Sequence, residues 1–183
     1  MVEHKDDNEL LEQFKHEATK ERAFTAILKK YQEKLYWHIR RMVVEHEDAN
    51  DVLQNMFVKA WKGLENFRED SKLYTWLYRI ATNESLTFLE QQKRRSTVSM
   101  SDEETGLYNN VKADSNFDGD KLEWKLQLAV QKLPEKQRAV FNLRYFDAMP
   151  YNEMSTVLET SEGALKASYH HAVKKIEDFI LNN

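Results

Sequence analysis

The feature that most constrains the fold is a helical period in the apolar residues, which recurs along most of the 183-residue chain. Between residues 49 and 64, for example, apolar side chains fall three and four positions apart, as on one face of an α-helix. The chain also has only 4 glycines and 2 prolines, the residues that most often interrupt helices. We therefore expect an all-α protein.

One stretch breaks this period. Residues 96–120 are rich in Ser, Thr, Asn, Gly and acidic residues and poor in apolar ones, which is typical of a linker. We expect two small helical domains, residues 1–95 and 121–183, joined by an acidic linker at 96–120. The segment Asp114 to Asp120 opens like an EF-hand loop, but Lys125 stands at the twelfth position, where calcium needs a glutamate. We expect no calcium site there.

The net charge of −4 is the wrong sign for a protein that holds DNA by its own field. Residues 1–95 carry 17 basic and 17 acidic side chains, the linker carries 1 and 6, and residues 121–183 carry 9 and 8. The excess acid is thus in the linker. We expect weak or undetectable DNA binding by the isolated chain.

Several function classes are disfavoured. The chain has no cysteine, no apolar run of about 20 residues and no signal-peptide pattern at its start, so we expect a cytoplasmic protein. None of the 6 histidines has metalloenzyme spacing, and no glycine-rich phosphate loop appears, so we expect no enzyme and no cofactor. His38 lies on an apolar stripe, and we interpret it as a packed histidine. His170 and His171 are adjacent, about 100° apart on a helix, and cannot easily share one metal ion.

The stretch from Phe67 to Arg95 carries a distinctive pattern. A charged loop at 68–72 precedes a helical segment, and a basic run ends it. One side of this helix is apolar: Leu73, Leu77, Ile80, Ala81 and Phe88. A second side holds Trp76, Arg79, Asn83, Thr87 and Arg94. An aromatic ring, cations and an amide on one stripe suit stacking on bases and holding phosphates. The alternative is that Trp76 simply packs. Glu84 lies close to the apolar side, either at the rim of the core or paired.

The C-terminal part predicts a helix-turn-helix. A short helix at 151–158, a three-residue connection and a longer helix capped by Ser161 form this arrangement, whose second helix lies in a DNA major groove. Gly163 would let the start of that helix approach a neighbouring backbone or DNA. The side expected to face the groove comprises Glu162, Lys166, Ala167, His170 and Lys174.

Three blocks of sequence resemble a known family in the same order. They are Asp48-Ala-Asn-Asp-Val-Leu-Gln-Asn-Met-Phe-Val-Lys-Ala-Trp61, Phe67 through Asn83, and Leu133-Pro-Glu-Lys-Gln-Arg138 through Lys175. Together they resemble an extracytoplasmic-function (ECF) sigma factor, a promoter-recognition subunit of bacterial RNA polymerase. The resemblance implies a region 2 domain, a flexible linker and a region 4 helix-turn-helix domain.

The resemblance also implies roles for individual residues. Asp48, Asp51, Gln54 and Phe57 match positions that meet the clamp helices of the largest polymerase subunit. Glu69, Asp70, Ser71 and Lys72 match a loop that captures a flipped base of the minus-ten element, and Trp76, Arg79, Asn83 and Arg94 match the surface for the melted strand. Ser161, Glu162, Lys166, Ala167, His170, His171 and Lys174 match the edge presented to the minus-thirty-five element. The family often has arginines where this chain has Ser168, His171 and Val173, so we expect weaker phosphate anchoring and an altered upstream preference.

The partners implied are core RNA polymerase, including the flap of its second-largest subunit, promoter DNA, and an anti-sigma factor, often membrane-bound. No small-molecule substrate is implied. A stand-alone helix-turn-helix regulator is the main alternative; it explains residues 121–183 but not the pattern at 67–95. The 25-residue linker spans about 28 Å as a free coil and must stretch to cover the roughly 58 Å between promoter elements. A closed form in which the two halves face each other is a further hypothesis.

Overall fold

The computed structural model describes residues 6–96 and 121–182. Within these ranges the chain forms eight helices and no strand, which confirms the all-α expectation. They are α1 (Asp7–Phe14), α2 (Lys20–Val43), α3 (His46–Leu64), α4 (Leu73–Ser96), α6 (Lys121–Gln131), α7 (Glu135–Tyr145), α8 (Tyr151–Leu158) and α9 (Glu162–Asn182). The expected linker, apart from Ser96, and the calcium-like segment at 114–120 lie outside the described residues. Among the helices at 6–96 and 121–182, none combines the length and the hydropathy that a membrane span requires.

The N-terminal half is a bundle in which α2 packs against α1, α3 and α4. Each helix contributes its apolar stripe to the core, which includes Ile39 of α2, Met56 of α3 and Leu77 of α4. The apolar spacing of Leu10, Leu11, Phe14 and Ala18 predicts that Ala18 belongs to the first helix, but Ala18 lies beyond the end of α1 and is exposed. The chain turns there because the Thr19 hydroxyl donates a 2.6 Å hydrogen bond to the carbonyl of Gln13.

The C-terminal half has a smaller core between α6, α7 and α9. Its buried members are Ala129, Val130, Leu133, Phe141, Ala172 and Ile176. The apolar period of the C-terminal part predicts that Leu122 and Tyr145 lie in the core, but both are largely exposed, at 59% and 54%. Phe141, one turn before Tyr145, fills the core instead, and the two rings stack with centroids 5.0 Å apart. Because α7 ends at Tyr145, that ring extends past the edge of the core.

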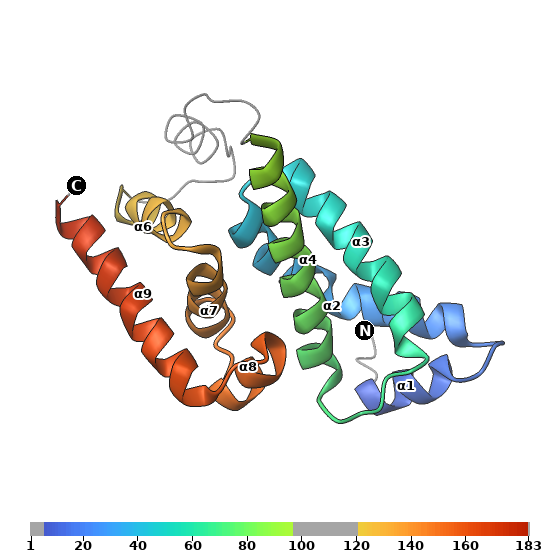
Figure 1. Cartoon of the computed structure of the whole chain (residues 1–183). Coiled ribbons are helices and arrows are strands. Elements are labelled where there is room, and N and C mark those ends of the chain that lie inside the picture. The colour runs from blue at the N-terminus through green and yellow to red at the C-terminus, as the bar shows by residue number, and fades with distance from the viewer. Residues whose placement is uncertain (1–5, 97–120, 183) are drawn as a thin grey trace.

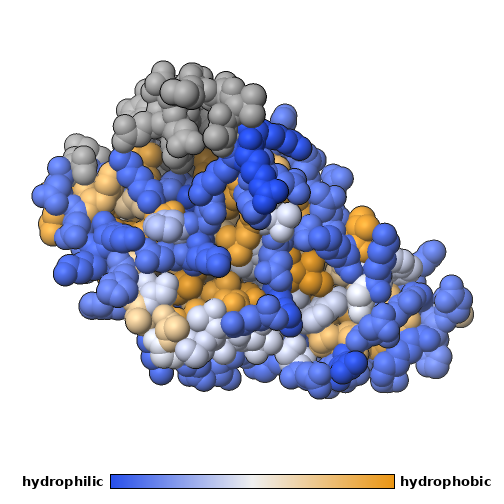
Figure 2. Space-filling model, viewed as in Figure 1, coloured by the Kyte–Doolittle hydropathy of each residue, from blue (hydrophilic) through white to orange (hydrophobic). Residues whose placement is uncertain are grey.

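The two halves pack directly on each other. Helix α4 lies against α7 and α8, and α2 also contacts α7 (Figure 1). The larger core is continuous across this junction, because it also contains Val140, Leu143, Met149, Met154, Val157 and Leu165 of the C-terminal half. Hydrophobic atoms are visible mainly in the middle of the molecule, and hydrophilic side chains cover its margins (Figure 2). The structure therefore has the closed arrangement.

Candidate nucleic-acid interface

Trp76 lies at the start of α4, where the chain comes back from α3. Its ring is half-buried and packs against Phe67, with centroids 5.2 Å apart. A Cβ atom added to Gly63 of α3 would lie 3.0 Å from Cζ2 of this ring. The glycine thus allows a close approach between the two helices. Trp76 therefore packs against Phe67 and Gly63, as in the alternative interpretation. The rest of its ring remains partly exposed beside the charged loop.

The polar stripe of α4 is partly occupied by the protein itself. Asn83 is exposed, and so is Arg94, whose guanidinium contacts Glu90 one turn earlier at 2.6 Å. Arg79 forms an ion pair with Glu159, which immediately follows α8. Glu84 is paired with Lys59 of α3, and its side chain is only 13% exposed. Glu84 is therefore both near the core and paired.

The charged loop before α4 lines a cleft of about 610 Å³. Glu69 has a left-handed backbone, with φ of 59°, and its carboxylate lies 3.4 Å from Lys15. The Lys72 ammonium lies 2.7 Å from Glu153 of α8. The cleft is lined on one side by this loop, including Asp70 and Ser71, and on the other by Asn152, Glu153 and Thr156 of α8. The loop is thus exposed to solvent on one side and faces α8 across the cleft on the other.

The acidic face of α3 is exposed at Asp51 and Gln54, whereas Asp48 and Phe57 are half-buried. A carboxylate near a helix N-terminus meets the dipole favourably, so the sequence predicts a helix start at Asp48. The helix starts two residues earlier, at His46, and Asp48 lies in its first turn. Partial burial, with repulsion from Glu45, Asp51 and Glu47, raises the pKa of Asp48. Val58 is 54% exposed and lies one turn after Gln54 on the same face. An apolar side chain among the polar residues of this face is the sequence signal that could have indicated Val58 as a further docking residue.

The polar face of α9 is open. Ser161 caps this helix, because its hydroxyl accepts a hydrogen bond of 3.3 Å from the Ala164 amide. All the other α9 residues assigned to the upstream element are exposed: Glu162, Lys166, Ala167, His170, His171 and Lys174. A Cβ atom added to Gly163 would have no neighbouring atom within 4 Å, so the expected close approach to a neighbouring backbone does not occur within the described part of the chain.

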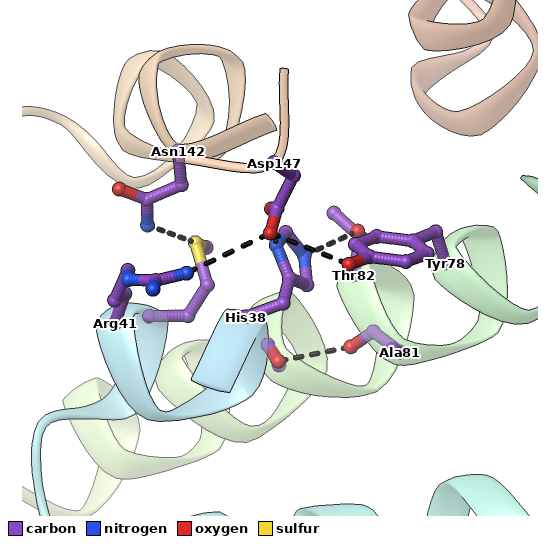
Figure 3. Close-up of polar contacts among 9 residues, drawn as sticks. His38, Arg41, Tyr78, Ala81, Thr82, Asn142 and Asp147 are labelled. Carbon is purple, nitrogen blue, oxygen red and sulfur yellow. Dashed lines mark hydrogen bonds and ion pairs between the residues drawn. The ribbon is translucent and has the colours of Figure 1, made fainter. Parts of the chain in front are cut away.

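A buried polar network joins the two halves (Figure 3). His38 of α2 is fully buried; its Nδ1 lies 2.9 Å from Asp147, in the loop before α8, and its Nε2 lies 2.9 Å from the Thr82 hydroxyl. The Tyr78 hydroxyl donates to Asp147 at 3.3 Å, and Arg41 lies 3.6 Å from it. Burial, with the nearby Asp147 charge, raises the pKa of Tyr78. His38 is thus a packed histidine. Within the described ranges, no cluster of three or more acidic or histidine side chains suits a metal ion.

Arg138 of α7 is a second connection that sequence reasoning missed. It is only 8% exposed, and burial lowers its pKa to about 10. Its guanidinium donates to the carbonyls of Met42, near the end of α2, at 2.8 Å, and of Gln131, at the end of α6, at 2.6 Å. Carbonyls at a helix C-terminus lack intrahelical partners and carry negative partial charge, so one cation satisfies two helix ends. The sequence signal that could have indicated a buried Arg138 is its position among the apolar residues Leu133, Ala139 and Val140.

The chain is similar to proteins of a known family. Residues 27–95 match the model for Sigma-70 region 2, and residues 123–176 match the model for Sigma-70 region 4. The chain is 31% identical over 185 residues to the RNA polymerase sigma-H factor of Pseudomonas aeruginosa, covering 97% of this chain and 95% of that protein. It is 30% identical over 166 residues to the ECF RNA polymerase sigma-E factor of Escherichia coli K12, covering 86% of each. This chain belongs to the ECF sigma factors.

Solved structures of low sequence identity share the fold of this sigma factor. CnrH, in complex with the cytosolic domain of CnrY, superposes with a TM-score of 0.71 at 22% identity, over 97% of this chain and 98% of that one. The sigma factor RpoE of Bartonella quintana, in complex with the anti-sigma factor NepR, gives 0.65 at 19% identity, over 86% and 96%. In this sigma factor the region 2 match covers most of α2, α3 and nearly all of α4, and the region 4 match runs from α6 into α9. The family is not a family of enzymes.

Proposed function

We propose that this ECF sigma factor binds core RNA polymerase and directs promoter-specific transcription initiation. The observation that carries the proposal is the order of the two family matches, region 2 over α2 to α4 and region 4 over α6 to α9. A stand-alone regulator needs only the second of these. We assign the region 2 domain to residues 1–95 and the region 4 domain to residues 121–183, with the linker between them.

In this proposal α9 reads the minus-thirty-five element. Its exposed face presents lysine and histidine donors directly after a capped helix start, where side chains of a recognition helix reach base edges. Lys166 and Lys174 supply the cations for guanine edges or phosphates, and His170 supplies a ring donor. Ser161, Glu162, Ala167 and His171 complete the edge that faces the groove.

The minus-ten strand is assigned to the charged loop and α4. Glu69, Asp70, Ser71 and Lys72 take the flipped base, and the cleft that they line gives space for one. Trp76, Arg79, Asn83 and Arg94 then hold the melted strand. Unstacking a base costs a few kcal/mol, and a chain with a net charge of −4 gains little from attraction to phosphates. Polymerase supplies the remaining energy by holding the DNA against the sigma factor.

Polymerase docking is assigned to α3. Asp51 and Gln54 are exposed there, Asp48 and Phe57 border them, and Val58 adds an apolar contact. Three acids near one helix start, Glu47, Asp48 and Asp51, favour a basic partner surface. We assign this face to the clamp helices of the largest subunit and the region 4 domain to the flap of the second-largest. We also infer an anti-sigma partner, as in the RpoE complex, and action in the cytoplasm.

A pull-down with purified core polymerase tests the docking, and run-off transcription from a promoter library tests the activity. We expect stable association and transcripts whose start sites depend on Asn83 and on the 69–72 loop. Asp51→Ala with Gln54→Ala should weaken the association without changing the helix content of the free protein. A chain that fails to associate with core polymerase, yet binds duplex DNA tightly and specifically by itself, would support the stand-alone regulator instead.

A further inference from the structure

Helix α1 lies before the residues that match region 2, yet it borders the loop that the proposed function assigns to the minus-ten base (Figure 1). Asp7 and Asn8, in its first turn, line the same cleft as that loop. Just beyond its other end, the Lys15 ammonium lies 3.4 Å from the Glu69 carboxylate. The helix therefore meets the cleft at one end and the loop at the other.

Both ends of α1 are attached to the helical bundle. Asp7 accepts hydrogen bonds of 2.7 Å from the Lys30 ammonium and from the Tyr31 hydroxyl, which both belong to α2. Phe14 is 3% exposed, and its ring packs edge-on against Trp61 of α3 with centroids 5.3 Å apart. Because α2 and α3 form part of the main core, α1 provides a fixed support for the loop.

Glu69 is the loop residue whose backbone most needs such support. Its φ of 59° is in the left-handed region, which is costly for a residue with a Cβ atom. Backbone strain of this kind persists where the surrounding structure holds it. Lys15 supplies a holding contact, and the Glu12 carboxylate, 2.6 Å from the Lys15 ammonium, orients that lysine. An exposed ion pair adds little to global stability, so we expect its effect to be confined to the loop.

The cleft also presents polar groups that a base could satisfy. Thr75 of α4 lines the cleft and is 2% exposed, and its hydroxyl has no hydrogen-bond partner within residues 6–96 and 121–182. Asn8 is exposed, and its amide carries both donors and an acceptor. The edge of a flipped base offers donors and acceptors as well. A base is therefore a better occupant than an apolar molecule, which would leave the buried hydroxyl unpaired.

We propose that α1 is part of the minus-ten reader: Lys15 positions the loop through Glu69, and Asn8, with Thr75, contacts the edge of the captured base. This inference rests on the assignment of the 69–72 loop to that base. Lys15 is a positioning residue because it acts through Glu69, whereas Asn8 and Thr75 select the base. The part of the chain before residue 27 thus contributes to promoter choice, although the region 2 match does not include it.

Hydrogen exchange of the free chain tests the positioning role without polymerase. We expect Lys15→Ala to speed the exchange of the amides at 68–72 by about threefold to tenfold and to leave the thermal midpoint unchanged. Lys15→Glu combined with Glu69→Lys restores the pair with reversed charges and should return the exchange to the parent rate, whereas Lys15→Glu alone should not. Lys29→Ala, which removes an exposed lysine of α2, is the matched control. Loop exchange that Lys15→Ala leaves unchanged would overturn the positioning role.

Run-off transcription from a promoter library randomised in the minus-ten element tests the base contact. We expect Asn8→Ala and Thr75→Val each to reduce the preference for one base of that element about tenfold, while association with core polymerase stays at the parent level. A base preference that neither variant alters would overturn the contact. A parent chain that does not associate with core polymerase would contradict the proposed function, and the exchange experiment would still decide whether α1 positions the loop.

Discussion

Two glycines in helices have opposite surroundings, and this difference is measurable. A side chain at Gly63 meets the Trp76 ring, whereas one at Gly163 meets open space. We expect Gly63→Leu to lower the free energy of unfolding by about 1–3 kcal/mol, because the ring must move. Gly163→Leu should raise it by up to about 1 kcal/mol, because it removes only the helix penalty of glycine. Urea unfolding of both variants checks the prediction, and equal effects would contradict the packing of Trp76.

Arg138 holds two helix ends, and its geometry matters more than its charge. We expect Arg138→Lys to cost about 1–2 kcal/mol of stability and Arg138→Met about 2–3 kcal/mol, since carbonyls of α2 and α6 lose donors. Burial lowers the pKa of Arg138 to about 10. The folded state therefore disfavours the charged form. This cost applies in full at neutral pH, begins to fall as the pH rises through about 10, and is gone only above the ordinary arginine pKa.

The pH dependence of stability provides a control for the Arg138 prediction. Burial at this site would lower the pKa of a lysine as it lowers that of Arg138, so we expect the difference between the parent and Arg138→Lys to stay constant between about pH 5 and 6.5, where both cations are charged. Chemical denaturation at several pH values measures it. A difference that changes strongly with pH there would mean that another titrating group, and not the fork of hydrogen bonds, accounts for the loss.

At the scale of single residues, local signals were sufficient for some predictions and not for others. Ser161 as a cap and His38 as a packed residue followed from immediate sequence context. The partner of His38 did not, because Asp147 is 109 residues away in the chain. The same holds for Arg79 and Glu159, which are 80 residues apart. No periodic pattern encodes which distant acid meets which base.

At the scale of helices, boundaries marked by proline or a cap were predicted well. Pro150 precedes α8, and the predicted range 151–158 is the observed one. The predicted start of α3 at Asp48 is two residues later than the observed start at His46, because Glu47 and Asp48 both suit a first turn and neither is the cap. The prediction of buried positions was wrong at helix ends, where Leu122 and Tyr145 keep the apolar period but extend past the core.

Helix α9 depends on its cap. We expect Ser161→Ala to lower the free energy of unfolding by about 1 kcal/mol, because the Ala164 amide loses its acceptor. Ser161→Asp should retain the stability, since a carboxylate accepts the same hydrogen bond and suits the helix dipole. Thermal unfolding followed by circular dichroism compares the variants. A Ser161→Asp protein as unstable as Ser161→Ala would show that the hydroxyl acts in another way.

At the scale of the whole molecule, one core spans both halves, and this has a thermodynamic consequence. Residues from Leu10 to Leu165 belong to the same cluster. We expect a single cooperative unfolding transition in which the calorimetric and van't Hoff enthalpies agree. Two independent domains would instead unfold in two steps. Differential scanning calorimetry of the full chain decides between these outcomes, and Asp147→Ala should shift the behaviour toward two steps.

The sequence predicted two helical units and allowed a closed form, but it did not indicate how the units fit. The apolar faces of α7 and α8 have the pattern of ordinary core positions, and their partners turned out to lie on α2 and α4. The assignment of reading and docking residues stays a prediction, since it depends on surfaces of polymerase and DNA.

The shared core also limits how long an opened molecule can persist. Val140, Leu143, Met149 and Val157 are each at most 4% exposed while the halves are together. If the two halves separate and no partner covers these side chains, their apolar surface becomes accessible to chaperones and proteases. We therefore expect a molecule that opens away from polymerase to be degraded faster than a closed one, so that transcription declines as unbound sigma factor is cleared.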